Sequence, residues 1–430
     1  MLEVSLILIS VIMLIGFFGD LVFKKTDIPS IVWLLFLGLL LGPVFGILAQ
    51  EPFLAVSGFF SAIAVIIILF EGGVKMDIYK LLQEAPKGTL LTLLSFIITV
   101  AVVTLITSAL GFFYLKTSIL HGILLGAIVG GISSPIVIPI VSKLAGISEK
   151  TKTILSIESA LTDVLCIVVA IAIIQALQMG AGDIGFVFKS LSINFSVGFV
   201  FGVIAGILWL PIMRKVERYE FSYTLTLALL FLIYSVTQLL GGSGAIAVLT
   251  FGIILGNGSK IMPMLGYSNL AYQMSSTMIM FHSLIAFFIR TFFFVFLGLL
   301  VKITNPMNIL IGVIISGGII LARVITMKLL AGRMGGLKEI DEKIITIMVP
   351  RGLAAAVLAY LPLQALPNDP FVKNLPDIVF TVIIMTTLIS VIGIKYMKNK
   401  YGEEESKEEE EVKMPKPKVI ESKQVKKEKK

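Results

Sequence analysis

Two carboxylates stand five residues apart inside one long apolar stretch of the sequence, Glu158 and Asp163. An α-helix turns about 100° per residue, so the two acids lie about 140° apart around its axis and face different neighbours. Ser159 comes four residues before Asp163 and lies on nearly the same face, one turn away. Oxygen ligands suit a hard cation, and a carboxyl group removed from water favours its protonated form. Asp163 is therefore a candidate to hold either a cation or a proton, one at a time.

Proline and glycine interrupt two other apolar stretches. Residues 131–135 read Gly-Ile-Ser-Ser-Pro, with Pro139 following, and a later stretch contains Pro350-Arg351-Gly352. Proline lacks a backbone donor and clashes with the preceding turn, so a helix breaks near each of these sites. Two broken helices in matching places of two inverted halves are the best sequence indication of a transporter's binding site. We therefore expect both breaks to lie with Asp163.

The other charges deep in apolar stretches are few. They are Glu71, Arg290, Arg323 and Arg351. A charge at mid-bilayer costs at least about 2.5–3.5 kcal/mol, so each needs a partner or a function. One alternative is purely structural, because buried acid–base pairs can hold helices together. We expect Glu158 to be such a structural anion, neutralised by Arg323 or Arg351, while Asp163 points into a cavity.

The elements that position these residues are expected to be membrane helices. The chain has 430 residues, of which 57% are hydrophobic and 14% charged, whereas a soluble domain carries about 25% charged residues. Its unbroken apolar stretches lack the alternation of a transmembrane β-barrel. The sequence therefore predicts an all-α polytopic membrane protein with about 13 transmembrane helices and inverted repeats.

The expected spans follow from the apolar stretches. They are 4–23, 31–48, 56–74, 89–114, 118–142, 151–178, 187–213, 221–240, 244–257, 264–301, 306–330, 341–362 and 374–398. The tenth is too long for one crossing, so we expect it to begin as a surface or tilted segment. No P-loop, dinucleotide fingerprint or His-Glu-x-x-His motif occurs, so we expect neither an enzyme nor a cofactor.

Lysine and arginine gather in alternate connections between the spans. Positively charged loops stay cytoplasmic, so the sequence predicts a multi-pass cell-membrane protein with its N-terminus outside and its C-terminus in the cytoplasm. The net charge of +8 is thus assigned to orientation and not to nucleic-acid binding. Residues 1–400 form the expected transporter domain. Residues 401–430, in which lysine and acidic residues nearly cancel, are expected to be a charged disordered tail.

The single cysteine, the N-terminal residues and the two histidines each allow a further prediction. The single cysteine, Cys166, lies in an apolar stretch, so neither an intrachain disulfide nor a cysteine metal cluster is expected. Residues 1–15 are apolar and lack a basic start, which indicates a retained first span and not a cleaved signal peptide. His121 and His282 are expected to be interfacial or packing residues.

Short motifs occur in order across nearly the whole apolar part of the chain. They are Leu37-Gly38 to Gly42-Pro43, Phe70-Glu71-Gly72-Gly73, Glu158-Ser159 to Asp163, Ser243-Gly244 to Gly256-Asn257, Arg290 to Phe296-Leu297-Gly298, Leu321-Ala322-Arg323 and Pro350-Arg351-Gly352. On these motifs the chain resembles the NhaP-type sodium/proton antiporters, the monovalent cation:proton antiporter 1 family of the cation/proton antiporter superfamily. The resemblance implies a homodimer with crossed, broken fifth and twelfth helices. It also implies alternating access, in which a core bundle (about 89–178 and 306–398) moves against a dimerisation panel formed by the rest.

The resemblance implies roles for single residues. Asp163 matches an aspartate that binds the ion and the proton, Ser159 matches a coordinating hydroxyl, and Glu71 matches a carboxylate near the ion. Glu158 matches a glutamate that the family pairs with arginines, here Arg323 and Arg351.

Two positions depart from the family pattern. Thr162 stands where an asparagine usually precedes the aspartate, and the usual Thr-Asp-Pro of the fifth helix reads Ser133-Ser134-Pro135. Thr162, Ser133 and Ser134 are therefore further candidates for the ion site, with neutral oxygens. A serine in place of the second carboxylate weakens the attraction for a cation and leaves the choice between Na⁺ and K⁺ open.

The leading hypothesis is an electroneutral antiporter that exchanges Na⁺ (or Li⁺) for H⁺, both competing for Asp163. A K⁺/H⁺ antiporter of the same fold is the alternative that Ser134 favours, and a cation channel using the same acids is a third. An intramembrane aspartyl protease needs two facing aspartates, and Asp163 has no second mid-span aspartate. The expected partners are the cation, the proton, the lipid bilayer and a second copy of the chain.

Overall fold

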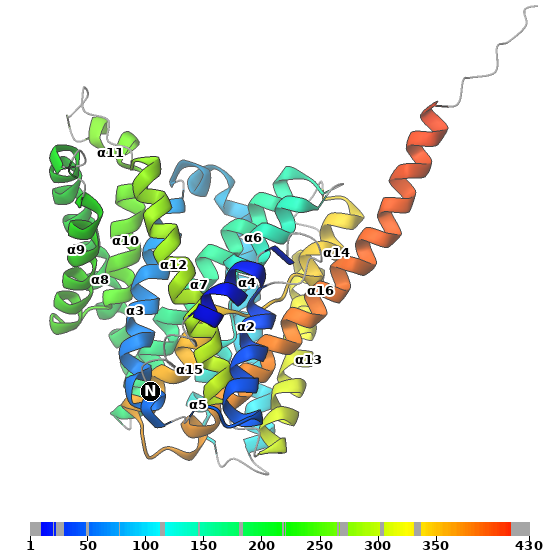
Figure 1. The fold of residues 1–430 in the computed structure, drawn as a ribbon, viewed down its shortest axis with the longest axis horizontal. Helices are drawn as coiled ribbons and strands as arrows, with labels where there is room; N and C mark the ends of the chain where they lie inside the picture. The colour runs from blue at the N-terminus through cyan, green and yellow to red at the C-terminus, as the bar shows by residue number, and fades with distance from the viewer. Residues whose placement is uncertain are drawn as a thin grey trace, which may run out of the picture.

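The structure of the protein is a computed structural model, drawn as a ribbon in Figure 1. It describes residues 10–19, 21–22, 30–48, 51–76, 78–111, 117–144, 147–179, 184–216, 219, 221–264, 266, 274–301, 305–330 and 337–413. Every regular element in these ranges is a helix and none is a strand, so the all-α expectation is confirmed.

The helices follow one another along the chain with short connections. After a helix over Ser10–Gly19 come α2 (Ser30–Leu39) with a π-helical turn η1 (Leu40–Val44), α3 (Glu51–Lys75), α4 (Ile78–Leu110), α5 (Ile119–Ile128), α6 (Ser134–Lys143), α7 (Glu149–Gln178), α8 (Ile184–Val216), α9 (Ser222–Leu239), α10 (Gly244–Gly256), α11 (Gly258–Met264), α12 (Ser276–Leu300), α13 (Pro306–Leu330), α14 (Glu339–Ile347), α15 (Leu353–Ala365) and α16 (Pro370–Lys413).

Seven described helices are long and apolar enough to cross a membrane alone, or up to 8 if the bent pair α10 and α11 is one span. Other predicted spans correspond to shorter helices or to helix pairs, such as α5 with α6 and α14 with α15. The polytopic helical fold is confirmed on these helices. The number of 13 crossings stays a prediction.

The predicted tenth span, 264–301, corresponds to α12, which begins at Ser276 in the structure. The side chain of Ser275 accepts a hydrogen bond from the backbone N–H of Met278 and caps this helix. A serine oxygen at this position satisfies one of the N–H groups that the first turn leaves free. Residues 258–264 form the separate helix α11, bent by 82° from α10.

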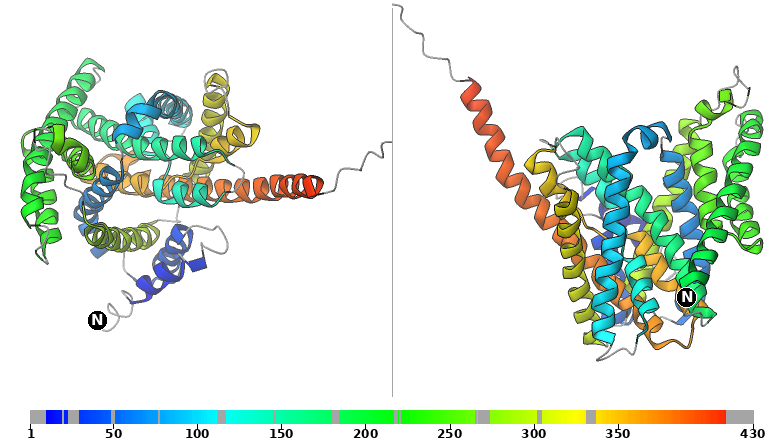
Figure 2. Two further views of the ribbon diagram at one scale, coloured as in Figure 1. Left: turned by 90° about the horizontal axis from the view of Figure 1, so that it is seen from above. Right: turned by 180° about the vertical axis from the view of Figure 1, so that it is seen from behind.

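By their contacts we assign the helices to two groups, and Figures 1 and 2 show the bundle from different sides. In the panel group (α2, α3 and α8–α12), α3 packs on α10 and α12, α10 packs on α8, and α12 packs on α2. In the core group (α4–α7 and α13–α16), α4 packs on α5, α7 and α13, and α16 packs on α13 and α15. The two groups meet where α3 contacts α15 and where α7 contacts α8.

Glycines make the closest helix contacts inside each group. A Cβ on Gly73 of α3 would come 2.5 Å from the carbonyl oxygen of Leu249 on α10. In the core group, a Cβ on Gly126 of α5 would come 2.9 Å from the carbonyl oxygen of Val100 on α4. Small residues let two helix backbones pack directly in this way. No glycine in the described ranges makes such a contact across the boundary between the groups.

Side chains cross that boundary instead. Asn194 of α8 donates a hydrogen bond from Nδ2 to Oε1 of Gln175 on α7, at 2.7 Å. The rings of Phe296 on α12 and Tyr360 on α15 lie 5.9 Å apart between centroids. These two contacts at the boundary are made by side chains, while the close glycine contacts of the described residues are internal to each group.

The last helix, α16, continues well beyond the bundle, and Figure 1 shows its end projecting away from the other helices. It ends at Lys413, so the expected tail of residues 401–430 begins within this helix. Residues 414–430 lie outside the described residues, as do residues 1–9 of the predicted first span.

Candidate functional site

The two predicted helix breaks meet each other in the core group. The chain leaves α5 at Ile128 and begins α6 at Ser134, and it leaves α14 at Ile347 and begins α15 at Leu353. The backbone N–H of Ser133 in the first break donates to the carbonyl oxygen of Pro350 in the second, at 2.8 Å. The expectation of two broken, crossed helices is confirmed by this contact. We call the region where the two breaks touch the crossing.

Asp163 lies beside the crossing. Ser134, the first residue of α6, donates a hydrogen bond from Oγ to Oδ2 of Asp163 on α7, at 3.3 Å. Both side chains are half-buried. The structure thus brings together two of the residues that the sequence indicated, a carboxylate and a neutral hydroxyl oxygen.

Thr162 and Ser159 lie next to Asp163 on α7 and are fully buried. The oxygen of Thr162 accepts a hydrogen bond from the backbone N–H of Ile132 at 3.1 Å, which ties α7 to the first break. The hydroxyl of Thr162 donates to the carbonyl oxygen of Ser159, and that of Ser159 donates to Ser156, at 3.3 and 3.0 Å. A hydroxyl that donates its proton keeps lone pairs for a further ligand, so the oxygen of Ser159 can still face a cation.

Glu158 faces away from this group, toward α13. Both of its carboxylate oxygens are paired with the Arg323 guanidinium, with Oε2 at 2.8 Å from Nη2 and a second bond between Oε1 and Nη1. Arg323 also donates to the carbonyl oxygen of Ile345 on α14 and to the hydroxyl of Ser95 on α4, each at 2.9 Å. Bidentate arginine–carboxylate pairs are among the stronger hydrogen-bonded contacts. The Glu158 carboxylate therefore joins four helices of the core group.

Arg351 has no such partner. Its side chain is 2% exposed, and its Nε and Nη1 make no hydrogen bond. Its backbone N–H donates to Oγ1 of Thr386 on α16, at 3.0 Å. The sequence left Arg323 and Arg351 as alternative partners of Glu158, and the ion pair in the structure is with Arg323.

Ser133 shares this lack of a partner. Its side chain is 3% exposed and its Oγ makes no hydrogen bond. The hydroxyl packs against Gly352, where an added Cβ would overlap it. Ser133 is thus at the crossing, but no hydrogen bond in the described residues joins it to Asp163.

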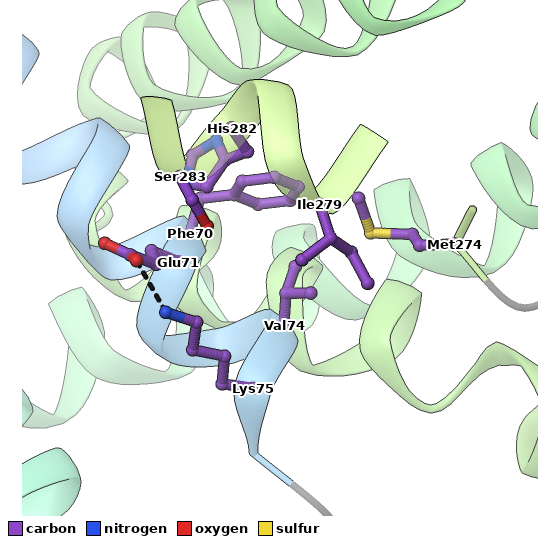
Figure 3. Close-up of a pocket in the computed structure, with 8 residues that line it drawn as sticks. All are labelled: Phe70, Glu71, Val74, Lys75, Met274, Ile279, His282 and Ser283. Atoms are coloured by element: carbon purple, nitrogen blue, oxygen red, sulfur yellow. Dashed lines mark hydrogen bonds and ion pairs between the residues drawn. The ribbon is translucent and has the colours of Figure 1, made fainter. Parts of the chain in front are cut away.

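Glu71 belongs to a different polar cluster, in the panel group (Figure 3). Lys75 Nζ lies 2.6 Å from one of its carboxylate oxygens and Arg290 Nη2 lies 3.6 Å from the other. Glu71 and Lys75 line a small pocket with His282 and with apolar side chains of α3 and α12, among them Phe70, Val74 and Ile279. Within the described residues, no hydrogen bond or ion pair joins Glu71 to Asp163.

His282 is a packing residue of the same cluster. Its Nε2 lies 3.1 Å from the carbonyl oxygen of Ile67, and its Nδ1 lies 2.5 Å from the hydroxyl of Tyr223. A carbonyl oxygen can only accept, so Nε2 carries a proton and donates to Ile67. Both ring nitrogens are thus hydrogen-bonded inside the protein, and the imidazole and the Phe70 ring form an edge-to-face pair.

Sequence reasoning missed Asp369, the partner of His121. The backbone N–H of Ser118 points at His121 Nδ1, so Nε2 carries the proton and donates to Oδ2 of Asp369, at 2.8 Å. Burial by itself raises the pKa of Asp369, but hydrogen bonds from His121 and from the N–H groups of Val372 and Phe371 outweigh it and hold the pKa below its ordinary value. The signal was present, because an aspartate directly before a proline is typical of a helix N-terminus.

The arrangement around Asp163 can do limited chemistry. Among the described residues, no group of three or more histidine, cysteine, aspartate or glutamate side chains could hold a metal ion. One carboxylate with neutral hydroxyl oxygens and the carbonyl groups of a broken helix suits a weakly held monovalent cation or a proton.

Comparison with known proteins gives one family for nearly the whole chain. The family model described as "Sodium/hydrogen exchanger, transmembrane" matches residues 7–398. A K(+)/H(+) antiporter NhaP of Alkalimonas amylolytica is 25% identical over 395 residues, which are 89% of this chain and 64% of that protein. The chain thus spans under two thirds of the length of that relative. Na(+)/H(+) antiporter 1 of Methanocaldococcus jannaschii is 28% identical over 403 residues, covering 87% of this chain and 90% of that one.

A solved structure shares the fold. The sodium proton antiporter MjNhaP1 of Methanocaldococcus jannaschii at pH 8 superposes with a TM-score of 0.73 at 22% sequence identity, over 93% of this chain and 97% of that one.

Proposed function

The chain belongs to the family of transmembrane sodium/hydrogen exchangers, and on that premise we propose that it exchanges Na⁺ (or Li⁺) for H⁺ across the cell membrane. The observation that carries the proposal is the position of Asp163, a half-buried carboxylate held by Ser134 beside the crossing of two broken helices. Asp163, Ser159, Thr162 and Ser134 supply the oxygens for the ion.

Competition for one carboxylate couples the two ions. A carboxylate out of water is disfavoured while charged, and it is neutralised by one cation or by one proton. If only an occupied Asp163 passes through the barrier, each cation carried one way is matched by one proton carried the other way. One-for-one exchange moves no net charge, so the proposed transport is electroneutral.

The movement we propose is a displacement of the core group against the panel group. Backbone contacts through glycine lie inside each group, as at Gly73 and Gly126, and they hold each group rigid. The contacts between the groups are made by side chains, such as those of Asn194 and Gln175. Side chains can exchange partners at a lower cost than packed backbones, which favours a boundary that slides.

The charge pattern of the connections supports an N-terminus outside and a C-terminus in the cytoplasm. A second copy is proposed to pair with the panel group, as the resemblance to the NhaP-type antiporters implies. Large apolar side chains on α8 and α9, among them Leu208 and Leu232, are exposed and face either lipid or that copy.

The experiment is transport by the purified protein in proteoliposomes. An imposed pH gradient should drive Na⁺ uptake, and Asp163→Asn should abolish it, because an amide can neither release a proton nor offer a negative charge. Uptake by Asp163→Asn at the rate of the unmodified protein would reject the proposal. A current without obligatory proton counterflow would favour a cation channel.

A K⁺/H⁺ antiporter is the second candidate, and Ser134 favours it. A neutral hydroxyl at this position lowers the negative charge that compensates dehydration, and Na⁺ holds its water more tightly than the larger K⁺. A relative named as a K(+)/H(+) antiporter and one named as a Na(+)/H(+) antiporter both match the chain, and the first is longer than the chain. Uptake measured with Li⁺, Na⁺ and K⁺ decides between the two, and Ser134→Asp should shift preference toward Na⁺.

A further inference from the structure

Arg351 is a buried arginine whose guanidinium forms no ion pair with a side chain in the described residues. It is 2% exposed, and its Nε and Nη1 have no hydrogen-bond partner. The peptide group that precedes Arg351 is fixed at both of its polar atoms, since the N–H of Arg351 donates to Thr386 and the carbonyl of Pro350 accepts from Ser133. Two buried guanidinium nitrogens without acceptors are destabilising, so we expect the folded protein to supply an acceptor at this place.

The two carboxylates near the crossing, Glu158 and Asp163, already accept hydrogen bonds from other residues. The Glu158 carboxylate accepts hydrogen bonds from both Nη1 and Nη2 of the Arg323 guanidinium. Asp163 accepts from Ser134 and is the carboxylate proposed to exchange its cargo. When a cation or a proton neutralises Asp163, the charge of Arg351 is the surplus at the crossing.

Ser133 supplies a second donor without a partner. Its hydroxyl is buried at the point where α6 and α15 begin, in contact with Gly352, the residue before α15. Neither helix has a side-chain cap, and helix N-termini favour anions. The carboxyl ends of α5 and α14 finish at the same crossing and offset these dipoles. The charge of Arg351 therefore remains.

We propose that the crossing binds a small monovalent anion of the chloride class, held by the Arg351 guanidinium and the Ser133 hydroxyl. The surplus charge is one, which calls for a monovalent anion, and the burial of both donors calls for a small one. The proposal gives Ser133 a role different from that of a cation ligand. Because Ser133 is next to Ser134, the anion would lie close to the cation at Asp163 and would strengthen cation binding.

The single cysteine of the chain provides a reporter for the test. Cys166 is 1% exposed, so a thiol-reactive fluorophore labels it only as the protein unfolds. Thermal unfolding would be recorded in sodium gluconate with increasing NaCl or NaBr, at constant Na⁺ and ionic strength. A ligand that binds only the folded state raises the unfolding temperature in a saturable way, and we expect this for both halides.

Variants assign the effect to the crossing. Arg351→Gln should lower the apparent halide affinity by at least about tenfold, and Ser133→Ala by about threefold, because each removes donors to the anion. Arg214→Gln makes the same substitution at an exposed arginine near the end of α8 and should change nothing. Asp163→Asn should keep the halide response, so a failure of the exchange proposal can be told apart from a failure of this one.

Bromide also locates the site directly. Anomalous diffraction from crystals grown in bromide should place the ion within hydrogen-bond reach of Arg351. A linear, unsaturable halide effect, an equal response in Ser133→Ala and the unmodified protein, or water alone at the crossing would each overturn the proposal. If Arg351→Gln does not fold, Ser133→Ala and the bromide position still decide.

Discussion

The backbone N–H of Ser133 donates to the carbonyl oxygen of Pro350 at 2.8 Å, so the two broken helices are bonded to each other at their breaks. Ser134, which follows Ser133, donates a hydrogen bond to Asp163. Arg351, which follows Pro350, is buried. A displacement of either half-helix is therefore passed to the other break and to the side chains that carry charge.

The contact between Ser133 and Gly352 predicts a sharp steric effect. A Cβ at position 352 would overlap the Ser133 hydroxyl, so Gly352→Ala should lower the free energy of unfolding by about 1–3 kcal/mol. Ser133→Gly in the same chain should restore part of the loss, because it removes the overlapping atoms. The measurement is thermal unfolding read by the thiol of Cys166.

Gly317 on α13 is the matched control. Nothing lies within 4 Å of a Cβ added there, and alanine favours a helix interior over glycine. Gly317→Ala should therefore be neutral or stabilising. Equal losses for both alanine variants would contradict the tight crossing.

Glu158 and Asp163 should differ in stability, not only in transport. Glu158→Gln leaves the buried Arg323 without its carboxylate, which typically costs about 3–5 kcal/mol. Asp163→Asn keeps an oxygen that can accept the long hydrogen bond from Ser134, and the side chain is half-buried, so its cost should be much smaller. Thermal unfolding of the two variants in the same detergent tests the order, and the reverse order would contradict the structural role of Glu158.

Cross-linking tests the sliding boundary. In a Cys166→Ser background, cysteines at Gln175 and Asn194 lie across the boundary, and a short thiol cross-linker should stop transport until it is cleaved by reductant. Cysteines at Asn308 and Asn374 form the matched control, because their side chains are hydrogen-bonded at 2.9 Å between α13 and α16 within the core group. Transport that continues after the first cross-link would rule out the proposed displacement.

Asp369 makes stability depend on pH in one direction. Its pKa is held below the ordinary value of 3.8, so its contribution is fully present above that value and is lost as the pH falls through it toward the lower folded-state pKa. Asp369→Asn should therefore destabilise the protein at pH 7 and lose this effect in acid. Unfolding followed by intrinsic fluorescence over pH 3 to 7 measures the difference, and a constant difference would contradict the assignment.

The sequence predicted those features that depend on local chemistry. Proline and glycine together mark the breaks before Ser134 and before Leu353. Proline alone does not end a helix here, since Pro211 lies inside α8 and Pro376 inside α16. The spacing along α7 separated Glu158 from Asp163, and the structure places them against different helices. Ser134 was expected at the ion site and lies against Asp163.

Pairing across helices could not be predicted in the same way. Arg323 and Arg351 are equivalent candidates in the sequence, and only the packing of α13 on α14 and α4 brings Arg323 to Glu158. Glu71 was expected near the ion, which stays a prediction, and its pairing with Lys75 and Arg290 follows from the packing of α3 on α12. These contacts depend on which helices are neighbours, and a single sequence does not reveal that.

The most direct test of the account is the number of protons released when a cation binds. We would add Na⁺ or K⁺ to the detergent-solubilised, weakly buffered protein near neutral pH and record the proton release together with the heat of binding. If the cation and the proton compete for Asp163, about one proton leaves per bound cation and none leaves in Asp163→Asn. Cation binding without proton release, or the same release in Asp163→Asn, would contradict the account.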